Sequence, residues 1–540
     1  MTNKEIAAHF RDLARFMEYA GENAFKIRSY SKAYDLLRKR DEPVAHLSAP
    51  ELQQLDGIGK AISEKIVALV HTGRLEQLDR YRATLPPAAA ELLQVRGLGP
   101  KKVKQLVEEL EIESVGELLH AIRENRVIEL KGYSDKSQAK LRQQLEFYQS
   151  SQGLARYADL EARALKFLKA LRQNCTRAEL TGELRRQLPV VTEITLLATR
   201  DALPYLREAG FSESEQSAIG ELDEFATRVL LTDLEDFARA WVHSSSAPEF
   251  LAEHTALREA DGANEAAVFA DADLPYVPAP QREAESPFPP VVAADVIGER
   301  DVRGVVHAHT TWSDGATSSE VLANACRDAG YDYLVVTDHS KAAGYAGGLS
   351  RERLLAQRDE LRALDARLPD FRVFAGTECD ILRDGTLDYD ADTLRTLDVV
   401  IASVHSVLTM SLEDATARIV RAIETGLVDI LGHPSGRLLL SRAGYPLDWD
   451  RVFDACASHG TAVELNASPY RLDVDWTLIP RALERGLKIS INPDAHALSG
   501  LGDIRYGVLA AQKAGLRPAE CLNALDADGF AAWLAARGQA

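Results

Sequence analysis

The chain has 540 residues, 63 Lys and Arg against 82 Asp and Glu, five cysteines and a net charge of −19 at pH 7. This length predicts three or four domains. No apolar run is as long as a membrane span, the first residues lack the apolar core of a secretion signal, and the cysteines form no Cys-x-x-Cys pair. We therefore expect a cytoplasmic protein with reduced thiols, not a membrane protein or a disulfide framework.

The charge is unevenly distributed along the chain. Residues 1–150 hold 24 basic and 22 acidic side chains, whereas residues 201–295 hold five and 20, and no lysine lies between Lys169 and Lys341. Contacts with a phosphate backbone need cations. We therefore expect nucleic acid to contact the N-terminal third and to avoid the middle of the chain.

The N-terminal third predicts helices and an internal repeat. Residues 3–49 place apolar residues three and four apart, and the second half of this stretch adds a basic face. Three self-similar units follow: LDGIGKAISEKIVALV, VRGLGPKKVKQLVEEL and the weaker LKGYSDKSQAKL. A unit that returns at intervals of 35–40 residues indicates a repeated structural element.

Each unit predicts a tight turn that opens a helix. The turns hold Gly57 and Gly59, then Gly97 and Gly99, then Gly132 with Ser134 in place of a second glycine. A helix that begins there directs free N–H groups and its dipole at an anion. The first helical turns carry lysines, which oppose the dipole unless a phosphate binds between them: Lys60, Lys101, Lys102 and Lys136.

These units resemble helix-hairpin-helix DNA-binding motifs. The resemblance implies sequence-independent binding of a DNA backbone, with a monovalent cation at the motifs. A single Gly-x-Gly would be equally typical of a plain turn between helices, so the argument depends on the repetition. Ser134 departs from the pattern and makes the third unit the weakest.

The arrangement up to residue 150 resembles the N-terminal domains of bacterial family X (polymerase beta-like) DNA polymerases. The resemblance implies a DNA-binding domain over residues 1–85, a fingers-like domain over 86–150 and a nucleotidyltransferase palm over 151–240. It also aligns Lys65 with the Schiff-base lysine of family members that have deoxyribose-phosphate lyase activity. A phosphate-contacting or solvated lysine is the simpler interpretation of Lys65, because a lyase needs a lowered pKa.

The palm can be checked against the family's metal-binding carboxylates. The family pattern is Gly-Ser-x-Arg-Arg-Gly, a strand with Asp-x-Asp, and a third Asp on a later strand. Here Glu183 replaces the serine, Glu193 and Thr195 replace the first two aspartates, and Leu230 replaces the third. Threonine and leucine cannot hold Mg²⁺ against a triphosphate. We therefore expect residues 155–240 to form a palm-like α/β fold without polymerase chemistry.

Residues 241–298 predict a thumb-like segment that ends in a linker. This stretch is acidic and then rich in proline, at positions Pro275, Pro278, Pro280, Pro287, Pro289 and Pro290. Proline-rich sequence between two regular regions is typical of a connecting segment.

The C-terminal half repeats one pattern seven times. Short apolar runs are each followed by a polar residue that can bind a metal: Val302–Val306 by His307 and His309, Tyr333–Thr337 by Asp338 and His339, Arg372–Thr377 by Glu378, Asp398–Ser403 by His405, Val428–Gly432 by His433, Ala462–Leu465 by Asn466, and Lys488–Asn492 by Asp494 and His496. Helical patterns lie between them, such as Ser318–Ala329, Arg351–Arg367, Leu412–Thr425 and Asp450–His459. Alternating strands and helices predict a parallel barrel, whose chemistry lies at the C-terminal ends of its strands.

The polar residues, with Asp314 after His309, are too many for one tetrahedral ion. Two or three divalent ions fit better, and histidine nitrogens favour Mn²⁺ or Zn²⁺, or Fe²⁺, over Mg²⁺. Clustered ions of this kind activate water and bind phosphoryl oxygens.

The motifs HAH, SDG, TDH, GTE, SVH, GHP and DAH resemble the PHP (polymerase and histidinol phosphatase) phosphoesterase domain. The resemblance implies a (β/α)7-type barrel over residues 299–540. It also implies three ion sites, of which the first two share Glu378: a first with His307, His309, Glu378 and Asp494, a second with Glu378, His405 and His433, and a third with Asp314, His339 and His496.

The sequence therefore predicts a multidomain α and α/β protein that binds DNA and cleaves phosphodiesters. We expect it to act in repair as a 3′-5′ exonuclease or to process 3′ ends and abasic sites on gapped, nicked or 3′-recessed DNA. Lys341, Arg437 and Arg471 follow ligand-bearing strand ends and could bind substrate phosphate or form surface ion pairs. Three alternatives remain open: an active gap-filling polymerase, a DNA-tethered scaffold, and a small-molecule phosphatase such as a histidinol-phosphate phosphatase.

Overall fold

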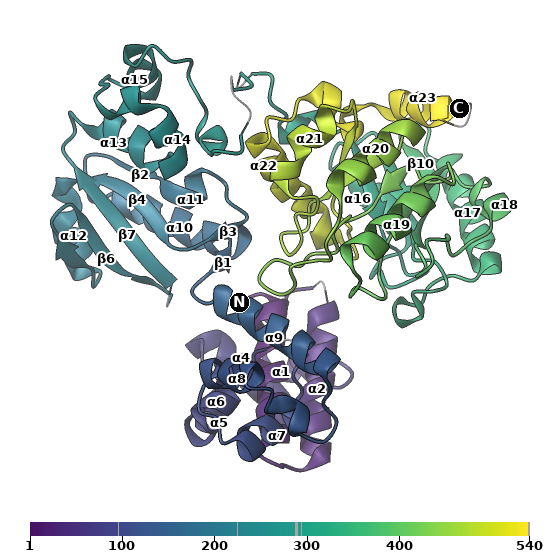
Figure 1. Cartoon of the computed structure of the whole chain (residues 1–540), viewed down its shortest axis with the longest axis horizontal. Coiled ribbons are helices and arrows are strands. Elements are labelled where there is room, and N and C mark those ends of the chain that lie inside the picture. The colour runs from purple at the N-terminus through teal and green to yellow at the C-terminus, as the bar shows by residue number, and fades with distance from the viewer. Residues whose placement is uncertain (41, 96, 224, 287–289, 293, 538–540) are drawn as a thin grey trace. The chain divides into compact units, whose positions relative to one another are not determined.

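The computed structural model describes residues 1–40, 42–95, 97–223, 225–286, 290–292 and 294–537. The chain divides into two compact units, Met1–Gln152 and Gly153–Ala540 (Figure 1). Within the described ranges, no helix is long and apolar enough to cross a bilayer. Pro287 and Pro289 of the expected linker lie outside the described residues. The domain boundaries expected at residues 85, 240 and 298 fall inside the two units and stay predictions.

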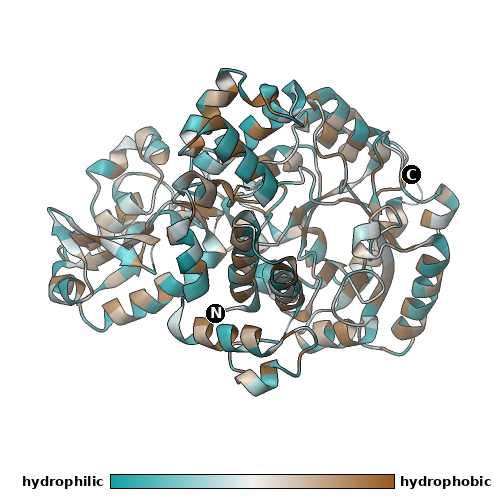
Figure 2. Ribbon diagram, turned by 90° about the horizontal axis from the view of Figure 1, so that it is seen from below, coloured by the Kyte–Doolittle hydropathy of each residue, from teal (hydrophilic) through white to brown (hydrophobic). Residues whose placement is uncertain are grey.

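The N-terminal unit is a helical assembly. Its helices are α1 Asn3–Tyr19, α2 Ala24–Lys39, α3 Ala49–Leu52, α4 Lys60–Thr72, α5 Glu76–Thr84, α6 Pro87–Leu92, α7 Pro100–Leu110, α8 Val115–Arg123 and α9 Asp135–Ser150. The side chains of Ile6, Phe10, Leu13 and Met17 recur on one face of α1 and are fully buried. Figure 2 shows the same division of helices into a hydrophobic and a hydrophilic side.

The three repeated units form three similar turns. Gly57, Gly97 and Gly132 have φ of +89°, +86° and +91°, a conformation that favours glycine. Helices α4 and α7 begin after Gly59 and Gly99, and neither start carries a side-chain cap. Ser134, by contrast, caps α9 by accepting a hydrogen bond from the Ser137 N–H. In the third unit, the Ser134 side chain therefore binds an N–H group at the helix start. In the first two units, the N–H groups at the helix start are left for another acceptor.

The second unit begins with a mixed sheet. Its strands are β2 Ala178–Leu180, β4 Ile194–Thr199, β5 Ser212–Ser214, β6 Ser217–Leu222 and β7 Phe225–Thr232, in the order β2-β4-β7-β6-β5, and only β4 and β7 pair in parallel. A two-stranded pair, β1 Ala155–Arg156 and β3 Val190–Val191, and the helices α10 Tyr157–Arg172, α11 Gly182–Arg185 and α12 Leu203–Glu208 complete it. This is an α/β arrangement of the kind expected for residues 155–240.

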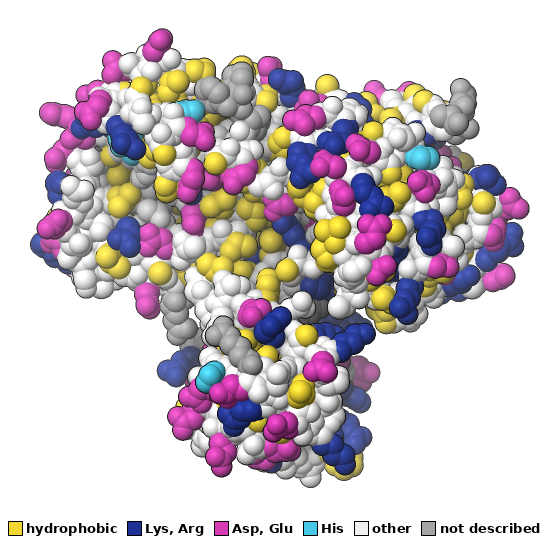
Figure 3. All heavy atoms as spheres, viewed as in Figure 1, with side chains coloured by type: hydrophobic (Ala, Val, Ile, Leu, Met, Phe, Trp, Pro, Cys, Tyr) yellow, Lys and Arg dark blue, Asp and Glu magenta, His cyan; other side chains and the backbone are white. Residues whose placement is uncertain are grey.

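A small helical cluster follows the sheet where the thumb-like segment was expected. It contains α13 Phe237–Ser244, α14 Pro248–Glu253 and α15 Glu265–Asp271. Val242, Phe250, Val268 and Phe269 form its buried core. Acidic side chains are spread over this part of the surface in Figure 3.

The C-terminal part is a seven-stranded parallel barrel that is nearly closed. Its strands are β8 Gly304–Ala308, β9 Tyr333–Val336, β10 Arg372–Asp380, β11 Val399–Ser403, β12 Ile430–Leu431, β13 Ala462–Asn466 and β14 Ile489–Asn492. They lie in sequence order, and a bridge between Ala308 and Ala495 links β8 to the segment after β14. The outer helices are α16 Ser319–Asp328, α17 Arg351–Asp365, α18 Ala391–Leu394, α19 Leu412–Ile423, α20 Trp449–His459, α21 Ile479–Leu483, α22 Ile504–Lys513 and α23 Ala527–Arg537.

Two apolar clusters enclose the barrel wall. Val306, Val335 and Ile401 belong to a cluster that Phe530 of α23 completes, with its ring 4.8 Å from that of Tyr333. The alternate residues of the strands pack against the outer helices in a larger cluster. Both faces of the strands are therefore buried, as a parallel sheet requires, and polar side chains concentrate at the C-terminal strand ends.

The palm and the barrel share a buried polar contact inside the second unit. Lys513 of α22 is fully buried, and its Nζ donates to the Arg186 carbonyl at 2.8 Å and to Glu283 Oε1 at 3.0 Å. Arg186 Nε donates to the same carboxylate at 2.9 Å. Beside this contact, Tyr506 and Leu509 of α22 pack against the palm core. The barrel is thus joined to the palm by both polar and apolar surface.

Candidate metal centre

The nine expected ligands come together at the C-terminal end of the barrel. Most of their side chains are buried, and Asp314 and His496 lie at the rim. They come from β8 and its loop (His307, His309, Asp314), the loop after β9 (His339), β10 (Glu378), the loops after β11 and β12 (His405, His433) and the loop after β14 (Asp494, His496). Residues that are far apart in sequence thus form one cluster because parallel strands end at the same edge.

Glu378 lies at the middle of the cluster. Its Oε1 is 2.8 Å from His433 Nε2 and 3.1 Å from His405 Nε2, and its Oε2 is 2.8 Å from His339 Nδ1. His307 Nε2 approaches Oε1 at 3.4 Å. The two oxygens therefore face different histidines, which is the arrangement a bridging carboxylate needs.

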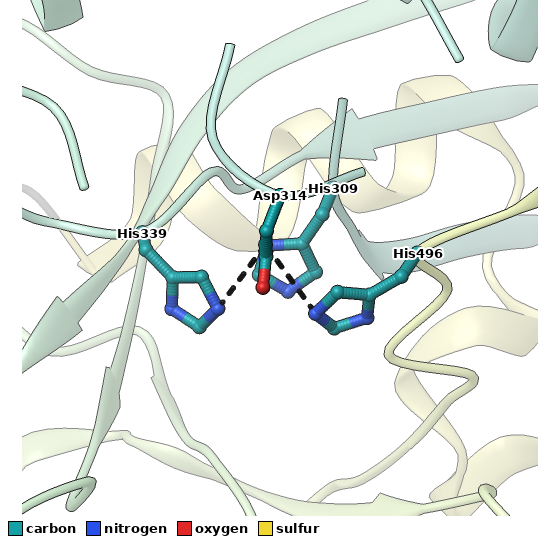
Figure 4. Close-up of side chains that lie close together, drawn as sticks. All are labelled: His309, Asp314, His339 and His496. Carbon is teal, nitrogen blue, oxygen red and sulfur yellow. Dashed lines mark ion pairs between the residues drawn. The ribbon is translucent and has the colours of Figure 1, made fainter. Parts of the chain in front are cut away.

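The donor atoms form three compact groups. Figure 4 shows one of them, His309, Asp314, His339 and His496, with Asp314 Oδ1 lying 3.5 Å from both His339 Nε2 and His496 Nε2. The other groups are His307, His309 and Glu378, and His339, Glu378 and His405. Asp494 Oδ1 lies 3.1 Å from His309 Nε2, next to the second group.

The grouping differs in detail from the one that the family resemblance implies. His309 belongs to two groups, and His339 stands with Glu378 and His405, where His433 was expected. His433 still contacts Glu378 directly. Seven of the nine expected residues fall within these groups, with His433 and Asp494 beside them, and the sharing of residues between groups is wider than expected.

The chemistry of the cluster fits divalent cations. Among the described residues, the fully buried His307 Nε2 and Glu378 Oε2 make no hydrogen bond, although His339 Nδ1 lies 2.8 Å from that Glu378 oxygen. Buried polar atoms of native proteins are almost always satisfied, so such atoms within one cluster indicate a further partner such as a cation. Mixed imidazole and carboxylate donors suit Mn²⁺, Zn²⁺ or Fe²⁺.

The sequence did not reveal the residues that hold the ligands in place. Glu464 of β13 is fully buried, and its Oε1 accepts from His307 Nδ1 at 2.5 Å and from Asn492 Nδ2 at 2.8 Å. Its Oε2 accepts from the His433 N–H at 2.5 Å. Asp380 lies 3.3 Å from His405 Nδ1 in the same supporting role. A charged residue in the otherwise apolar run AVELN was the available signal.

Backbone conformation also departs from the regular strand at the ligands. His307, His433 and Asp494 have φ of +68°, +23° and +51°. A positive φ is uncommon for residues other than glycine, and the residues that adopt it concentrate at functional sites. A register shift in β8 between Val305 and Ala308 accompanies the turn at His307. His307 and His309 therefore both reach the cluster through a bulge, and the simple alternation expected of a strand does not apply.

The charges of the cluster are strongly coupled. Burial lowers the pKa of His307, but the carboxylates of Glu464, Asp494 and Glu378 outweigh burial and raise it well above its usual value. Burial and the neighbouring His496 and His339 instead lower the pKa of His309 to about 3. One imidazole is thus held protonated by carboxylates while the next stays neutral beside other histidines.

The three cations expected to bind phosphate lie in different surroundings. Arg471 Nε is 3.7 Å from Asp494 Oδ2, which places it at the cluster. The Arg437 guanidinium is engaged by Asp475 and by the carbonyls of Arg471 and Leu472. Lys341 is exposed at the rim, with Nζ 3.9 Å from Asp388 Oδ1.

The palm positions carry no set of carboxylates facing one another. Arg228 lies directly opposite Thr195 in the β4–β7 pair, Leu230 lies opposite Leu197, and Arg228 Nε donates to Glu193 at 2.9 Å. Glu183 accepts from the Thr192 N–H at 2.6 Å. Sequence reasoning missed Arg228, which places a cation next to the one remaining acidic position.

The two arginines of the palm motif are also engaged. Arg185 NH1 donates to Glu265 Oε1 at 2.8 Å, and its guanidinium lies 3.5 Å from the centre of the Trp241 ring. Arg186 pairs with Glu283. Both therefore hold the palm to the segments that follow it.

The lysines of the repeated units point to solvent. Lys60, Lys101, Lys102 and Lys136 are exposed, and Lys65 is half-buried with Nζ 5.9 Å from the centre of the Tyr30 ring. The positive-φ glycines and uncapped helix starts of the first two units lie beside them. Free N–H groups beside exposed cations form an anion-binding surface.

Comparison with known proteins gives matches to both parts of the chain. Residues 1–75 match the family model described as a helix-hairpin-helix domain, and residues 89–146 match a SAM-like helix-hairpin-helix tandem. The DNA polymerase/3′-5′ exonuclease PolX of Bacillus subtilis (strain 168) is 31% identical over 97% of this chain and 98% of its own length. A probable phosphatase of Thermoanaerobacter sp. (strain X514) is 29% identical over 40% of this chain and 88% of its own length, and one of Shewanella sp. (strain MR-4) is 30% identical over 36% and 77%.

Proposed function

The chain belongs to the family of the bacterial DNA polymerase/3′-5′ exonuclease PolX, and from this premise we propose that it is a DNA-binding, metal-dependent nuclease that removes nucleotides from 3′ ends. The observation that carries the proposal is Glu378 surrounded by five histidines in a buried cluster at the barrel's C-terminal end. The related probable phosphatases support phosphoester chemistry for the barrel.

The ligand assignment is part of the proposal. His307, His309, Glu378 and Asp494 would hold one ion, Glu378, His405 and His433 would hold a second, and Asp314, His339 and His496 would hold a third. Mn²⁺ or Zn²⁺ is the proposed occupant because histidine nitrogens dominate the donors. When bound there, the ions supply an activated water and compensate the charge of the phosphoryl oxygens.

Residues of the chain orient the ligand histidines and bind the substrate phosphates. Glu464 accepts the His307 Nδ1 proton, which turns Nε2 towards the cluster, and Asp380 Oδ1 lies 3.3 Å from Nδ1 of His405, whose Nε2 faces Glu378. Arg471 is the cation best placed to bind a non-bridging phosphate oxygen, because its guanidinium already lies next to Asp494. Lys341 at the rim suits the next phosphate along the strand.

We propose that the N-terminal unit supplies DNA affinity. Its first two hairpin units present uncapped helix starts and exposed lysines, and its described surface shows both basic and acidic side chains in Figure 3. Gapped, nicked or 3′-recessed duplexes are the proposed substrates, and a nucleoid-associated location in the cytoplasm follows from such substrates. A small-molecule phosphatase would have no use for these repeats.

We propose further that the palm does not polymerise DNA. Thr195 and Leu230 offer no carboxylate, and Arg228 pairs with Glu193 where Mg²⁺ would have to bind. The printed name of the Bacillus subtilis relative includes polymerase activity, so chain extension is the competing function.

The decisive experiment uses a labelled 3′-recessed duplex with Mn²⁺, with and without deoxynucleoside triphosphates. We expect the labelled strand to shorten in both conditions and the double variant His307→Ala/His309→Ala to be inert. His459→Ala, which removes a histidine outside the cluster, serves as the matched control and should retain activity. Extension of the strand when triphosphates are present would show that the palm is an active polymerase.

A further inference from the structure

The loop that follows β9 presents an aromatic ring beside the metal centre. Tyr345 lies six residues after the ligand His339, and its ring centre is 6.5 Å from that of the His339 imidazole. The side chain is 75% exposed. It therefore contributes little to the barrel core, and it stands next to the proposed reacting phosphate.

The backbone beneath Tyr345 is held firmly. The Leu349 N–H donates to the His339 carbonyl at 2.8 Å, and the Tyr389 hydroxyl donates to the Leu349 carbonyl at 2.6 Å. Ala343 and Ala346 on either side of Tyr345 are buried. The loop from Lys341 to Leu349 thus has an ordered base from which the tyrosine ring projects.

A second set of contacts ties this loop to the loop after β8. Arg353 donates to the carbonyls of both Gly347 and Trp312. Gly347 has φ of +69°, and a Cβ there would lie 3.3 Å from the Ser313 carbonyl oxygen, so the loops approach closely. The two loops that border His339 and Asp314 are therefore fixed relative to one another, and the backbone that carries the ring is held beside the cluster.

The Tyr345 side chain is a neutral phenol near pH 7, as tyrosine ordinarily is. A neutral phenol offers a flat apolar face on one side and a hydroxyl at its tip. Of the parts of a nucleotide, this face matches the base, since the phosphate and its charge suit the ions and Arg471.

We propose that Tyr345 stacks on the base of the 3′-terminal nucleotide while the phosphate of that nucleotide lies at the metal cluster. This inference rests on the proposed nuclease function and names the residue that makes the site prefer nucleotides that carry a base. Stacking is tolerant of sequence, because every base has an aromatic face. Tyr345 thus serves as a specificity-determining residue and takes no part in the chemical step.

The test compares Tyr345→Ala, Tyr345→Phe and the unaltered full-length protein on two matched duplexes. One duplex ends in an ordinary 3′ nucleotide, and the other ends in a tetrahydrofuran residue that lacks the base. We expect Tyr345→Ala to lose about tenfold or more in kcat/KM on the first duplex, mainly through KM, and little on the second. Tyr345→Phe should behave like the unaltered protein on both.

Three results would overturn the inference. Equal losses on the two duplexes would indicate a structural role, and an impaired Tyr345→Phe would indicate a role for the hydroxyl. No loss on either duplex would show that the ring does not contribute to binding. A binding measurement separates it from the nuclease proposal. The fluorescence of a 3′-terminal 2-aminopurine, measured with chelator-treated protein, should be quenched by the unaltered and Phe forms and not by Tyr345→Ala. If quenching follows this pattern while no form cleaves DNA, the proposed function fails and the stacking stands; the absence of quenching in the unaltered protein refutes the stacking itself.

Discussion

At the scale of single residues, the metal centre depends on carboxylates that accept protons from the ligand histidines. Glu464 receives four hydrogen bonds, from His307, Asn492, Asn466 and the His433 backbone, while being completely buried. Both oxygens of its carboxyl group accept hydrogen bonds, which the amide of a glutamine could not do. The orientations of two proposed ligands therefore converge on one residue that contacts no substrate.

Glu464→Gln tests this support. The amide nitrogen of glutamine must face either His307 Nδ1 or the His433 N–H, so one buried donor loses its acceptor. We expect metal affinity or activity to fall by about 10- to 100-fold, with the full nine-ligand set still in place. Metal content by mass spectrometry after dialysis, together with exonuclease rate, measures the effect.

The comparison for Glu464→Gln is Glu413→Gln, which alters an exposed carboxylate of α19 that pairs with Arg451. That variant should keep both metal and activity, because exposed ion pairs contribute little. Unchanged metal retention in Glu464→Gln would show that the ligand histidines orient themselves without it.

The gathering of the nine proposed ligands could be predicted from sequence because most of them follow apolar runs, and strand ends of a parallel barrel meet at one edge. The supporting residues could not. Glu464 lies inside a strand, 157 positions from the histidine that it orients. Tyr345 could not be predicted either, because only the structure shows that this exposed loop tyrosine lies close to His339.

At the scale of elements, the repeated hairpin units show how far sequence similarity predicts geometry. Gly57, Gly97 and Gly132 were expected to turn the chain, and all three adopt positive φ. The departure at Ser134 has a structural result, because its hydroxyl occupies the helix start that stays uncapped in the other units. The third unit keeps the turn and has less capacity to bind an anion.

This difference predicts unequal roles for the lysines of the units. Lys101→Gln/Lys102→Gln should weaken binding to duplex DNA and reduce the slope of log K against log salt by about 0.9 for each phosphate that the variant no longer neutralises. The weakening should be independent of DNA sequence, because interactions with the backbone carry no base information. Fluorescence anisotropy over a salt series measures both quantities.

Lys136→Gln provides the control within the same fold, since it alters the first turn of the capped helix α9. We expect a smaller change in slope than for either lysine of the second unit. A Lys136 effect as large as that of Lys101 and Lys102 would contradict the assignment of DNA binding to the uncapped helix starts.

Strand limits were the weaker part of the prediction at this scale. The run expected to end at Thr377 continues to Asp380, so Glu378 is a strand residue, and β8 continues through His307 to Ala308. In both cases the apolar run ended before the hydrogen bonding did, because the metal-binding side chains project from the last residues of the strands. The apolar pattern of a sequence reports which residues pack against apolar neighbours. A strand limit predicted from that pattern therefore falls too early where the last strand residues are polar.

At the scale of the whole molecule, the order of the fold types, helical unit, mixed sheet and parallel barrel, was predictable, and the way the mixed sheet meets the barrel was not. Arg186, Glu283 and Lys513 are far apart in sequence and meet in one buried contact between palm and barrel. Burying a lysine costs free energy even when it is paired. The contact ties the orientation of the two parts to a small number of hydrogen bonds.

The buried lysine gives this contact a pH dependence. Burial, only partly offset by Glu283, lowers the pKa of Lys513 from 10.5 to about 8. Between those two values the unfolded chain binds more protons than the folded chain, so the free energy of unfolding of the second unit should rise with pH from 8 to 10.5. Denaturant titrations across that range measure the slope.

Lys513→Met removes the titrating group while keeping much of the apolar stem. In this variant the slope between pH 8 and 10.5 should be reduced relative to the unaltered protein. An unchanged slope would mean that Lys513 reaches water in the folded protein and keeps an ordinary pKa.

The engagement of Arg185 and Arg186 limits how this enzyme can be dissected. Arg185 pairs with Glu265 and Arg186 with Glu283, and Glu283 in turn binds Lys513 of the barrel. A fragment that starts at the barrel would leave that lysine without its carboxylate and uncover Tyr506 and Leu509. The smallest autonomous nuclease fragment should therefore start before the palm, near residue 153, even though every proposed metal ligand lies after residue 300. A palm without polymerase carboxylates would then persist as a folding partner of the catalytic barrel.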